Sequence, residues 1–121
     1  MSAAEDVVIW HNPRCSKSRR TLELIREAGI EPVVRLYLKD APVPAEIRAA
    51  LAGLGFDDPR ALMRACEPVY REGGLADISD ADALVAAMVA DPVLIERPLV
   101  MRGSRAAIGR PPEAVLALLK G

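Results

Sequence analysis

The chain has 121 residues, with sixteen lysines and arginines against seventeen aspartates and glutamates, and a formal net charge of −1. Its length predicts one domain over residues 1–121, whose core needs neither a metal nor disulfides. The balanced charge argues against a general role on nucleic acid or at a membrane surface, because both usually need a basic excess. No apolar run approaches the ~20 residues of a membrane span. The first six residues lack the features of a signal peptide, so we expect a cytoplasmic protein with reduced thiols.

The first third of the chain predicts a β-α-β unit. Val7–Trp10 is a short apolar run of the kind buried in a parallel sheet, and the Asn-Pro pair at 12–13 then forces a turn. A helical pattern follows over residues 16–28, with Gly29 as its C-terminal stop. The β-branched run at 33–37 resumes as a strand, which we expect to be parallel to the first through a right-handed crossover.

Residues 44–96 are predicted to form a mainly helical insert. Pro44 suits the first turn of a helix, and glycines at 53 and 55 break the pattern. A short helix is expected around residues 61–65. Ser79, with Asp82 three residues later, is an N-cap signature for a further helix that ends at residues 91–92.

The last part of the chain predicts two strands and a helix. Apolar runs at 99–101 and 106–108 flank Arg-Gly-Ser-Arg, which indicates a hairpin. A terminal helix should begin near Pro111, with Val115, Leu116 and Leu119 facing the core. The order β-α-β, helical insert, β-β-α predicts an α/β protein with a thioredoxin-like fold and a mixed central sheet, where a reactive thiol after the first strand is the expected placement.

Cys15 is the strongest candidate for chemistry. It lies between the first apolar run and the first helical pattern, where helix N–H groups and the helix dipole favour a thiolate and bind anions. Residues 11–20 hold four lysines and arginines and no acid. The alternative is a buried structural thiol. Because residue 18 is serine, a dithiol cycle within the motif is excluded, and Thr21 excludes a Cys-x5-Arg phosphatase loop.

Other residues leave two interpretations open. His11, the only histidine, either supports the Cys15 thiolate or simply hydrogen-bonds within the loop. Cys66 either resolves an adduct on Cys15 or is a passive residue at a helix end. Lys17 and Arg19 either add positive charge to the site or cover a solvated helix face. One histidine and two separated cysteines offer no ligand cluster, so we expect no metal.

The sequence His-Asn-Pro-Arg-Cys-Ser-Lys-Ser-Arg at 11–19, with Arg64, Arg97-Pro98 and Arg110-Pro111, resembles the glutaredoxin-dependent arsenate reductase (ArsC) family over nearly the whole chain. Characterised members carry Gly-Thr after the cysteine, whereas this chain has Ser16-Lys17 and is closer to a bacterial sub-branch of shorter proteins. The resemblance implies that the Cys15 thiolate attacks arsenate and that three arginines hold the oxyanion, namely Arg64, Arg97 and Arg110. It also matches His11 to a histidine that favours the thiolate, and it places Ser18 and Asn12 in the substrate-binding set.

The implied cycle needs no tightly bound cofactor and uses glutathione as co-substrate. A glutathione thiol displaces the arsenic adduct, and glutaredoxin then reduces the mixed disulfide. In thioredoxin-like folds a cis-proline faces the active cysteine, so Pro98 should be cis, with Arg97 beside the thiol. Three guanidinium groups would offset the repulsion between a thiolate and an oxyanion. Selenate or another oxyanion could replace arsenate.

Two rival functions remain open at this point. One is a monothiol glutaredoxin-like thiol transferase, in which the arginines bind the carboxylates of glutathione. The other is a regulator resembling Spx, which shares the fold and binds RNA polymerase. Spx proteins usually carry Cys-x-x-Cys and a different C-terminal segment, so Ser18 counts against that function.

Overall fold

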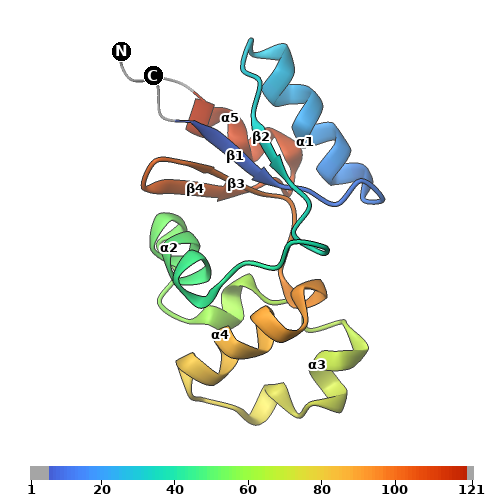
Figure 1. Cartoon of the computed structure of the whole chain (residues 1–121), viewed down its shortest axis with the longest axis vertical. Helices are drawn as coiled ribbons and strands as arrows, with labels where there is room; N and C mark the ends of the chain where they lie inside the picture. Colours follow the sequence, from blue (N-terminus) through green and yellow to red (C-terminus); the bar gives the residue numbers. More distant parts are fainter. Residues whose placement is uncertain (1–5, 120–121) are drawn as a thin grey trace.

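A four-stranded mixed sheet joins the N-terminal and C-terminal parts of the chain. The computed structural model describes residues 6–119. The strands lie in the order β2-β1-β3-β4 and are β1 (Val7–Trp10), β2 (Val33–Arg35), β3 (Leu99–Arg102) and β4 (Arg105–Ile108). β1 is parallel to β2 and antiparallel to β3, and β3 and β4 form an antiparallel hairpin (Figure 1). The predicted mixed sheet is therefore confirmed.

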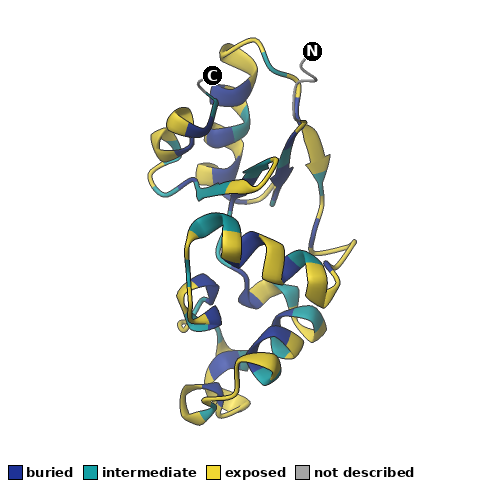
Figure 2. Cartoon of the chain, turned by 90° about the vertical axis from the view of Figure 1, so that its left-hand side faces the viewer, coloured by how far each residue is buried: buried dark blue, intermediate teal, exposed yellow. Residues whose placement is uncertain are grey.

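Alternate residues of the central strands face two different cores. Ile9 of β1 and Val100 of β3 pack with Ile25 of α1 (Ser16–Glu27) and with residues of the C-terminal helical segment. Trp10 and Leu99 instead belong to a larger core on the other face. This alternation is expected for a sheet that helices cover on both faces. Figure 2 accordingly shows helices that are buried on one side and exposed on the other.

Every element between β2 and β3 in the described chain is helical. These elements surround the larger core and gather below the sheet in Figure 1. They are α2 (Pro44–Leu54), η1 (Pro59–Leu62), α3 (Pro68–Glu72), η2 (Leu75–Asp77), α4 (Ala81–Ala90) and η3 (Pro92–Leu94), where η marks a 3-10 turn. Of these, α3, η2 and η3 were not predicted individually. Within residues 6–119, none of the helices is both long and apolar enough to cross a membrane.

The short helix predicted over residues 61–65 is wrong in its position. The η1 turn ends at Leu62, and the chain then continues in extended form. The backbone N–H of Arg64 donates to the carbonyl of Leu94 (2.7 Å), and the backbone N–H of Glu96 donates to the carbonyl of Leu62 (2.8 Å). This antiparallel pairing satisfies backbone groups that a helix would otherwise have used. It also brings Arg64 and Glu96 together.

The second strand is shorter than predicted and ends at Arg35 rather than at residue 37. The backbone N–H of His11 still donates to the carbonyl of Arg35 (2.8 Å), but the N–H of Asn12 donates to a side chain instead. After the turn at 12–13 begins, the chain no longer offers β2 a strand with which to pair. The chain after Arg35 bends at Leu36, whose carbonyl accepts two backbone N–H groups, and it leaves the sheet.

The N-cap of α4 is Asp80 rather than the predicted Ser79. The Asp80 carboxylate accepts the backbone N–H of Asp82 (3.2 Å), which serves the first turn as a serine hydroxyl would. Two adjacent residues of the chain can cap equally well, so the sequence alone does not choose between them.

The C-terminal helix turns a different face to the core than predicted. A 3-10 turn, η4 (Pro112–Val115), precedes α5 (Leu116–Leu119), and its three-residue period changes the phase of the helix. Val115 and Leu118 are buried, whereas Leu116 is 36% exposed and Leu119 is half-buried. The inward placement of Leu116 was therefore wrong.

Arg60 ties separate parts of the helical segment together. Its Nη1 donates to the hydroxyl of Tyr70 (2.6 Å) and to the carbonyl of Leu75 (2.9 Å), and its Nη2 donates to the carbonyl of Ile78. One charged group thereby satisfies three acceptors, one on α3 and two at the ends of η2. Arg48, by contrast, is exposed and contacts only Asp82 among the described side chains (2.8 Å).

We predict that Arg60→Met lowers the free energy of unfolding by about 2–4 kcal/mol, because partly buried acceptors lose a charged donor. Arg48→Met makes the same chemical change at an exposed ion pair and should lower it by less than about 0.5 kcal/mol. Urea unfolding followed by circular dichroism measures both. Equal losses in the two variants would contradict the anchoring role of Arg60.

Candidate active site

The register of the sheet brings three connections to one edge. Trp10 at the end of β1 pairs with Leu99 at the start of β3, and Leu99 pairs with Ile108 at the end of β4. The segments that follow β1, precede β3 and follow β4 therefore leave the sheet at the same edge. In that order, these segments carry Cys15, Arg97 and Arg110.

Cys15 is the N-cap residue of α1 and is 9% exposed. Its backbone N–H donates to the carbonyl of Asn12 (3.0 Å), which closes the turn. Its carbonyl accepts the backbone N–H of Arg19 (3.0 Å), which begins the helix. The thiol thus lies where the first-turn N–H groups have no acceptor within the helix.

Opposing effects set the pKa of the Cys15 thiol. Burial raises that pKa, but the backbone N–H of Ser18, the charge of Arg97, the backbone N–H of Lys17 and the charge of Arg110 together bring it below its ordinary value. Nη2 of Arg110 lies 3.8 Å from the sulfur. The site therefore favours the thiolate, the form in which cysteine acts as a nucleophile.

Ser18 joins the active loop to the helix. The side chain is fully buried, its Oγ accepts the backbone N–H of Asn12 (3.0 Å), and Oγ also lies 2.7 Å from Nδ1 of His11. The serine of the Cys-x-x-Ser motif thus fixes the loop that precedes Cys15. Although it stands where a Cys-x-x-Cys motif has its second cysteine, its side chain is buried in this hydrogen-bond network.

His11 lies against Ser18 rather than acting as a cation beside the thiol. The ring is 6% exposed. Burial, and then the positive charges of Arg26 and Arg19, hold the pKa of His11 below its ordinary value. The imidazole is accordingly neutral near pH 7, and within residues 6–119 it makes no hydrogen bond to Cys15. Any support that His11 gives to Cys15 passes through Ser18 and the loop.

Three arginines converge on one carboxylate oxygen. Oε1 of Glu96 lies 3.0 Å from Nε of Arg110, 3.5 Å from Nη1 of Arg97 and 3.9 Å from Nε of Arg64. The structure therefore brings together the three arginines that were predicted as an oxyanion site. Arg110 connects this group directly to the sulfur of Cys15.

The Arg97 guanidinium forms a long ion pair with Glu96 (3.5 Å) but has donors that make no hydrogen bond. Its Nε and Nη1 are buried and have no hydrogen-bond partner among the described residues. The Arg97–Pro98 peptide bond is cis, as expected for this position, and the Arg110–Pro111 bond is also cis, which was not predicted. Buried donors without a hydrogen bond are unfavourable, so a bound anion that accepted hydrogen bonds from them would be stabilised.

Two carboxylates complete the cluster, and sequence reasoning missed both. Glu67 pairs with Nη1 of Arg64 three residues before it, and Glu96 contacts all three arginines. The spacing of Arg64 and Glu67 could have suggested their pairing. Glu96 reaches Arg64 only because the two segments pair through their backbones, which no local pattern indicates.

Cys66 lies at the border of the arginine cluster. It is exposed, it precedes α3 rather than ending a helix, and its sulfur is 3.9 Å from Nη2 of Arg64. Both cysteines are free thiols. In the part of the chain that the structure describes, no group of three or more His, Cys, Asp or Glu side chains could hold a metal.

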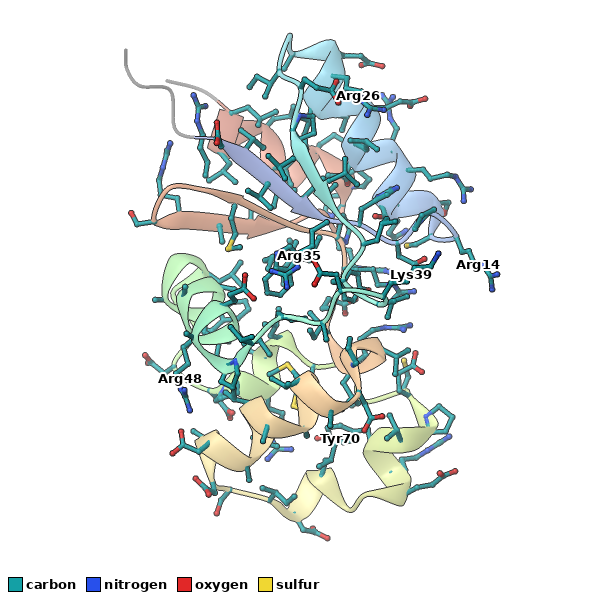
Figure 3. All side chains as sticks on the ribbon, viewed as in Figure 1. Arg14, Arg26, Arg35, Lys39, Arg48 and Tyr70 are labelled. Carbon is teal, nitrogen blue, oxygen red and sulfur yellow. The ribbon has the colours of Figure 1, made fainter. Side chains whose placement is uncertain are left out.

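A cleft of about 280 Å³ opens beside the Cys15 loop. It combines apolar side chains with two cations, Arg14 and Lys39, which Figure 3 shows on the same side of the molecule. Asn12, predicted to contact substrate, lines this cleft, although its Oδ1 accepts the backbone N–H of Arg14 (3.0 Å). The other lining residues are His11, Pro13, Leu36 and Leu38.

This arrangement defines a thioredoxin-like α/β protein with one activated cysteine at a helix start. The model of the ArsC family matches residues 10–118, a range that contains every predicted site residue. The chain belongs to the ArsC family.

Individual relatives resemble this chain over nearly its whole length. The uncharacterized protein YfgD of Escherichia coli strain K12 is 50% identical over 116 residues, which cover 95% of this chain and 98% of that protein. A protein of Haemophilus influenzae named arsenate reductase is 44% identical over 115 residues, which cover 93% and 98%. The solved structure of an arsenate reductase from Vibrio cholerae is 48% identical, with a TM-score of 0.90 and a coverage of 94% and 98%.

We predict that iodoacetamide alkylates Cys15 with a half-maximal rate at a pH below that of an ordinary cysteine, because only the thiolate reacts and its pKa is lowered. Arg97→Ala and Arg110→Ala remove positive charge, so each should move this midpoint to higher pH. The rate of alkylation is measured by intact mass in a Cys66→Ser background, where Cys15 is the remaining thiol. Arg105→Ala, on exposed β4 surface, is the control. Site variants that titrate like this control would contradict the assignment.

Proposed function

We propose that this protein reduces arsenate to arsenite, with glutathione as the electron donor and glutaredoxin as the recycling partner, in a reducing compartment such as the cytoplasm. The observation that carries the proposal is the thiol of Cys15, whose pKa is lowered and whose sulfur contacts Arg110. Arg110 in turn lies with Arg97 and Arg64 around one oxygen of Glu96. The chain also belongs to a family that includes proteins named arsenate reductase. An anionic substrate and a nucleophilic thiolate are the chemistry that such a site suits.

The reaction begins with attack of the Cys15 thiolate on arsenic(V). A sulfur–arsenic bond forms, and one arsenate oxygen leaves as water after protonation. A glutathione thiolate then attacks the Cys15 sulfur, the sulfur–arsenic bond breaks, and its electron pair stays on arsenic, which departs as arsenite. Glutaredoxin takes the glutathione from Cys15, and a second glutathione releases it from glutaredoxin. Arsenate and two glutathione thus give arsenite, glutathione disulfide and water.

The arginines would make the first step possible. A thiolate and an oxyanion repel each other, and guanidinium groups placed beside both offset that repulsion. Arg110 already contacts the sulfur, and the buried Nε and Nη1 of Arg97, which make no hydrogen bond among the described residues, are donors that an oxyanion could use. Arg64 would add a third charge from the helical segment.

A thiol from outside the motif must complete the cycle, because the motif holds one cysteine and Ser18 is buried in the loop. The cleft beside that loop fits glutathione in chemical character, since Arg14 and Lys39 are cations and glutathione carries two carboxylates. Cys66 is the alternative source of a resolving thiol. Its exposure would let it react, but its sulfur contacts Arg64 and not Cys15.

A thiol transferase acting on glutathione adducts is the second candidate. The observation that favours it is the pairing of the three arginines with Glu96 and Glu67, which leaves fewer free charges for an oxyanion. In that function, the cations beside the active loop would bind glutathione carboxylates and Cys15 would exchange disulfides without arsenic.

We predict that the purified protein forms arsenite from arsenate when glutathione and glutaredoxin are present. Cys15→Ser should abolish turnover, because the nucleophile is removed. Arg97→Ala should lower kcat/KM by about 10²-fold, as expected for loss of a preorganised donor to a developing charge. Arg105→Ala, which removes the same type of side chain away from the site, should retain wild-type turnover.

The same samples distinguish the two candidate functions. Intact-mass analysis after incubation with glutathione disulfide reports whether Cys15 accepts glutathione. If the wild-type protein forms no arsenite while Cys15 still accepts glutathione, the arsenate proposal is wrong and the thiol transferase is favoured.

A further inference from the structure

Glu96 occupies the centre of the arginine cluster in the ligand-free protein. One of its carboxylate oxygens lies within 3.9 Å of nitrogens on all three guanidinium groups. The same oxygen is 3.2 Å from the backbone nitrogen of Arg97. These are the donors that a tetrahedral oxyanion bound beside Cys15 would use.

The arginines do not depend on Glu96 alone for their positions. Nε of Arg110 also donates to the carbonyl of Arg97 (2.8 Å), and Nη1 of Arg64 pairs with Glu67. The backbone of Arg64 is fixed by its bond to Leu94. Arg110 and Arg64 would therefore keep these partners without the Glu96 charge.

The local charges also limit what the cluster can bind. Three guanidinium groups face the carboxylates of Glu96 and Glu67, and Arg110 also faces the sulfur of Cys15, so most of the positive charge is already balanced before any substrate arrives. The Glu96 side chain is 28% exposed, which leaves it a route towards solvent. An incoming anion must compete with this carboxylate for the same donors.

We propose that Glu96 is a specificity-determining residue that acts as an internal competitor for oxyanions. Its charge pairs with the three guanidinium groups in the empty site, and an oxyanion binds there in competition with this carboxylate. The inference rests on the proposed function, in that it assigns the arginine cluster to oxyanion binding. It goes further, because it makes Glu96 a residue that weakens binding and sets how strongly charged a ligand must be to enter.

Binding of inorganic phosphate, a tetrahedral oxyanion that undergoes no reduction, tests this directly. The measurement is isothermal titration calorimetry in a Cys15→Ser background. Glu96→Gln keeps the shape of the side chain and removes its charge, so phosphate should bind about tenfold more tightly. Glu96→Asp keeps the charge on a shorter side chain and should bind with intermediate affinity. Glu72→Gln removes an exposed charge on α3 and should leave the affinity unchanged.

A second readout needs neither phosphate nor turnover. With Cys15 intact, Glu96→Gln should move the pH midpoint of Cys15 alkylation downward, because a negative charge near the thiolate is lost. Unchanged or weaker phosphate binding in Glu96→Gln would overturn the inference and make Glu96 an organiser of the arginines. If phosphate binds more tightly but arsenate is never reduced, the inference stands and the proposed function fails.

Discussion

The pairing of Trp10 with Leu99, and of Leu99 with Ile108, is the constraint on which the site depends. These pairs fix where β1 ends, where β3 begins and where β4 ends, and all three points lie at one edge of the sheet. Cys15 follows the first by five residues, Arg97 precedes the second by two, and Arg110 follows the third by two. A shift of the register by one residue would exchange the two faces of these strands and separate the thiol from its arginines.

The chemistry of the site depends on the charges around a buried cysteine. Burial alone would raise the pKa of Cys15, and the N–H groups of the helix start and two arginines bring it below its ordinary value. The arginines are in turn restrained by Glu96 and Glu67, so the cluster is not a simple positive pocket. Electrostatic interactions in such a shielded site are stronger than at an exposed surface.

The order of elements and the position of Cys15 could be predicted because they depend on local patterns. The apolar run at 7–10, the turn at 12–13 and the following helix are each encoded by neighbouring residues. The role of Glu96 could not be predicted, because it results from backbone pairing between segments about thirty residues apart. The lowered pKa of His11 likewise depends on its burial in the folded chain, which the sequence does not show. The family resemblance supplied the three arginines, but not the carboxylate at their centre.

The central claim is that the Cys15 thiolate and the arginines form one oxyanion site. The most direct measurement is protection of the thiol, in which the Cys66→Ser protein is alkylated with and without arsenate, in the absence of any reductant. Arsenate should slow the alkylation of Cys15, and Arg97→Ala should largely remove this protection. Equal alkylation rates with and without saturating arsenate would contradict the claim and separate the thiol from the arginine cluster.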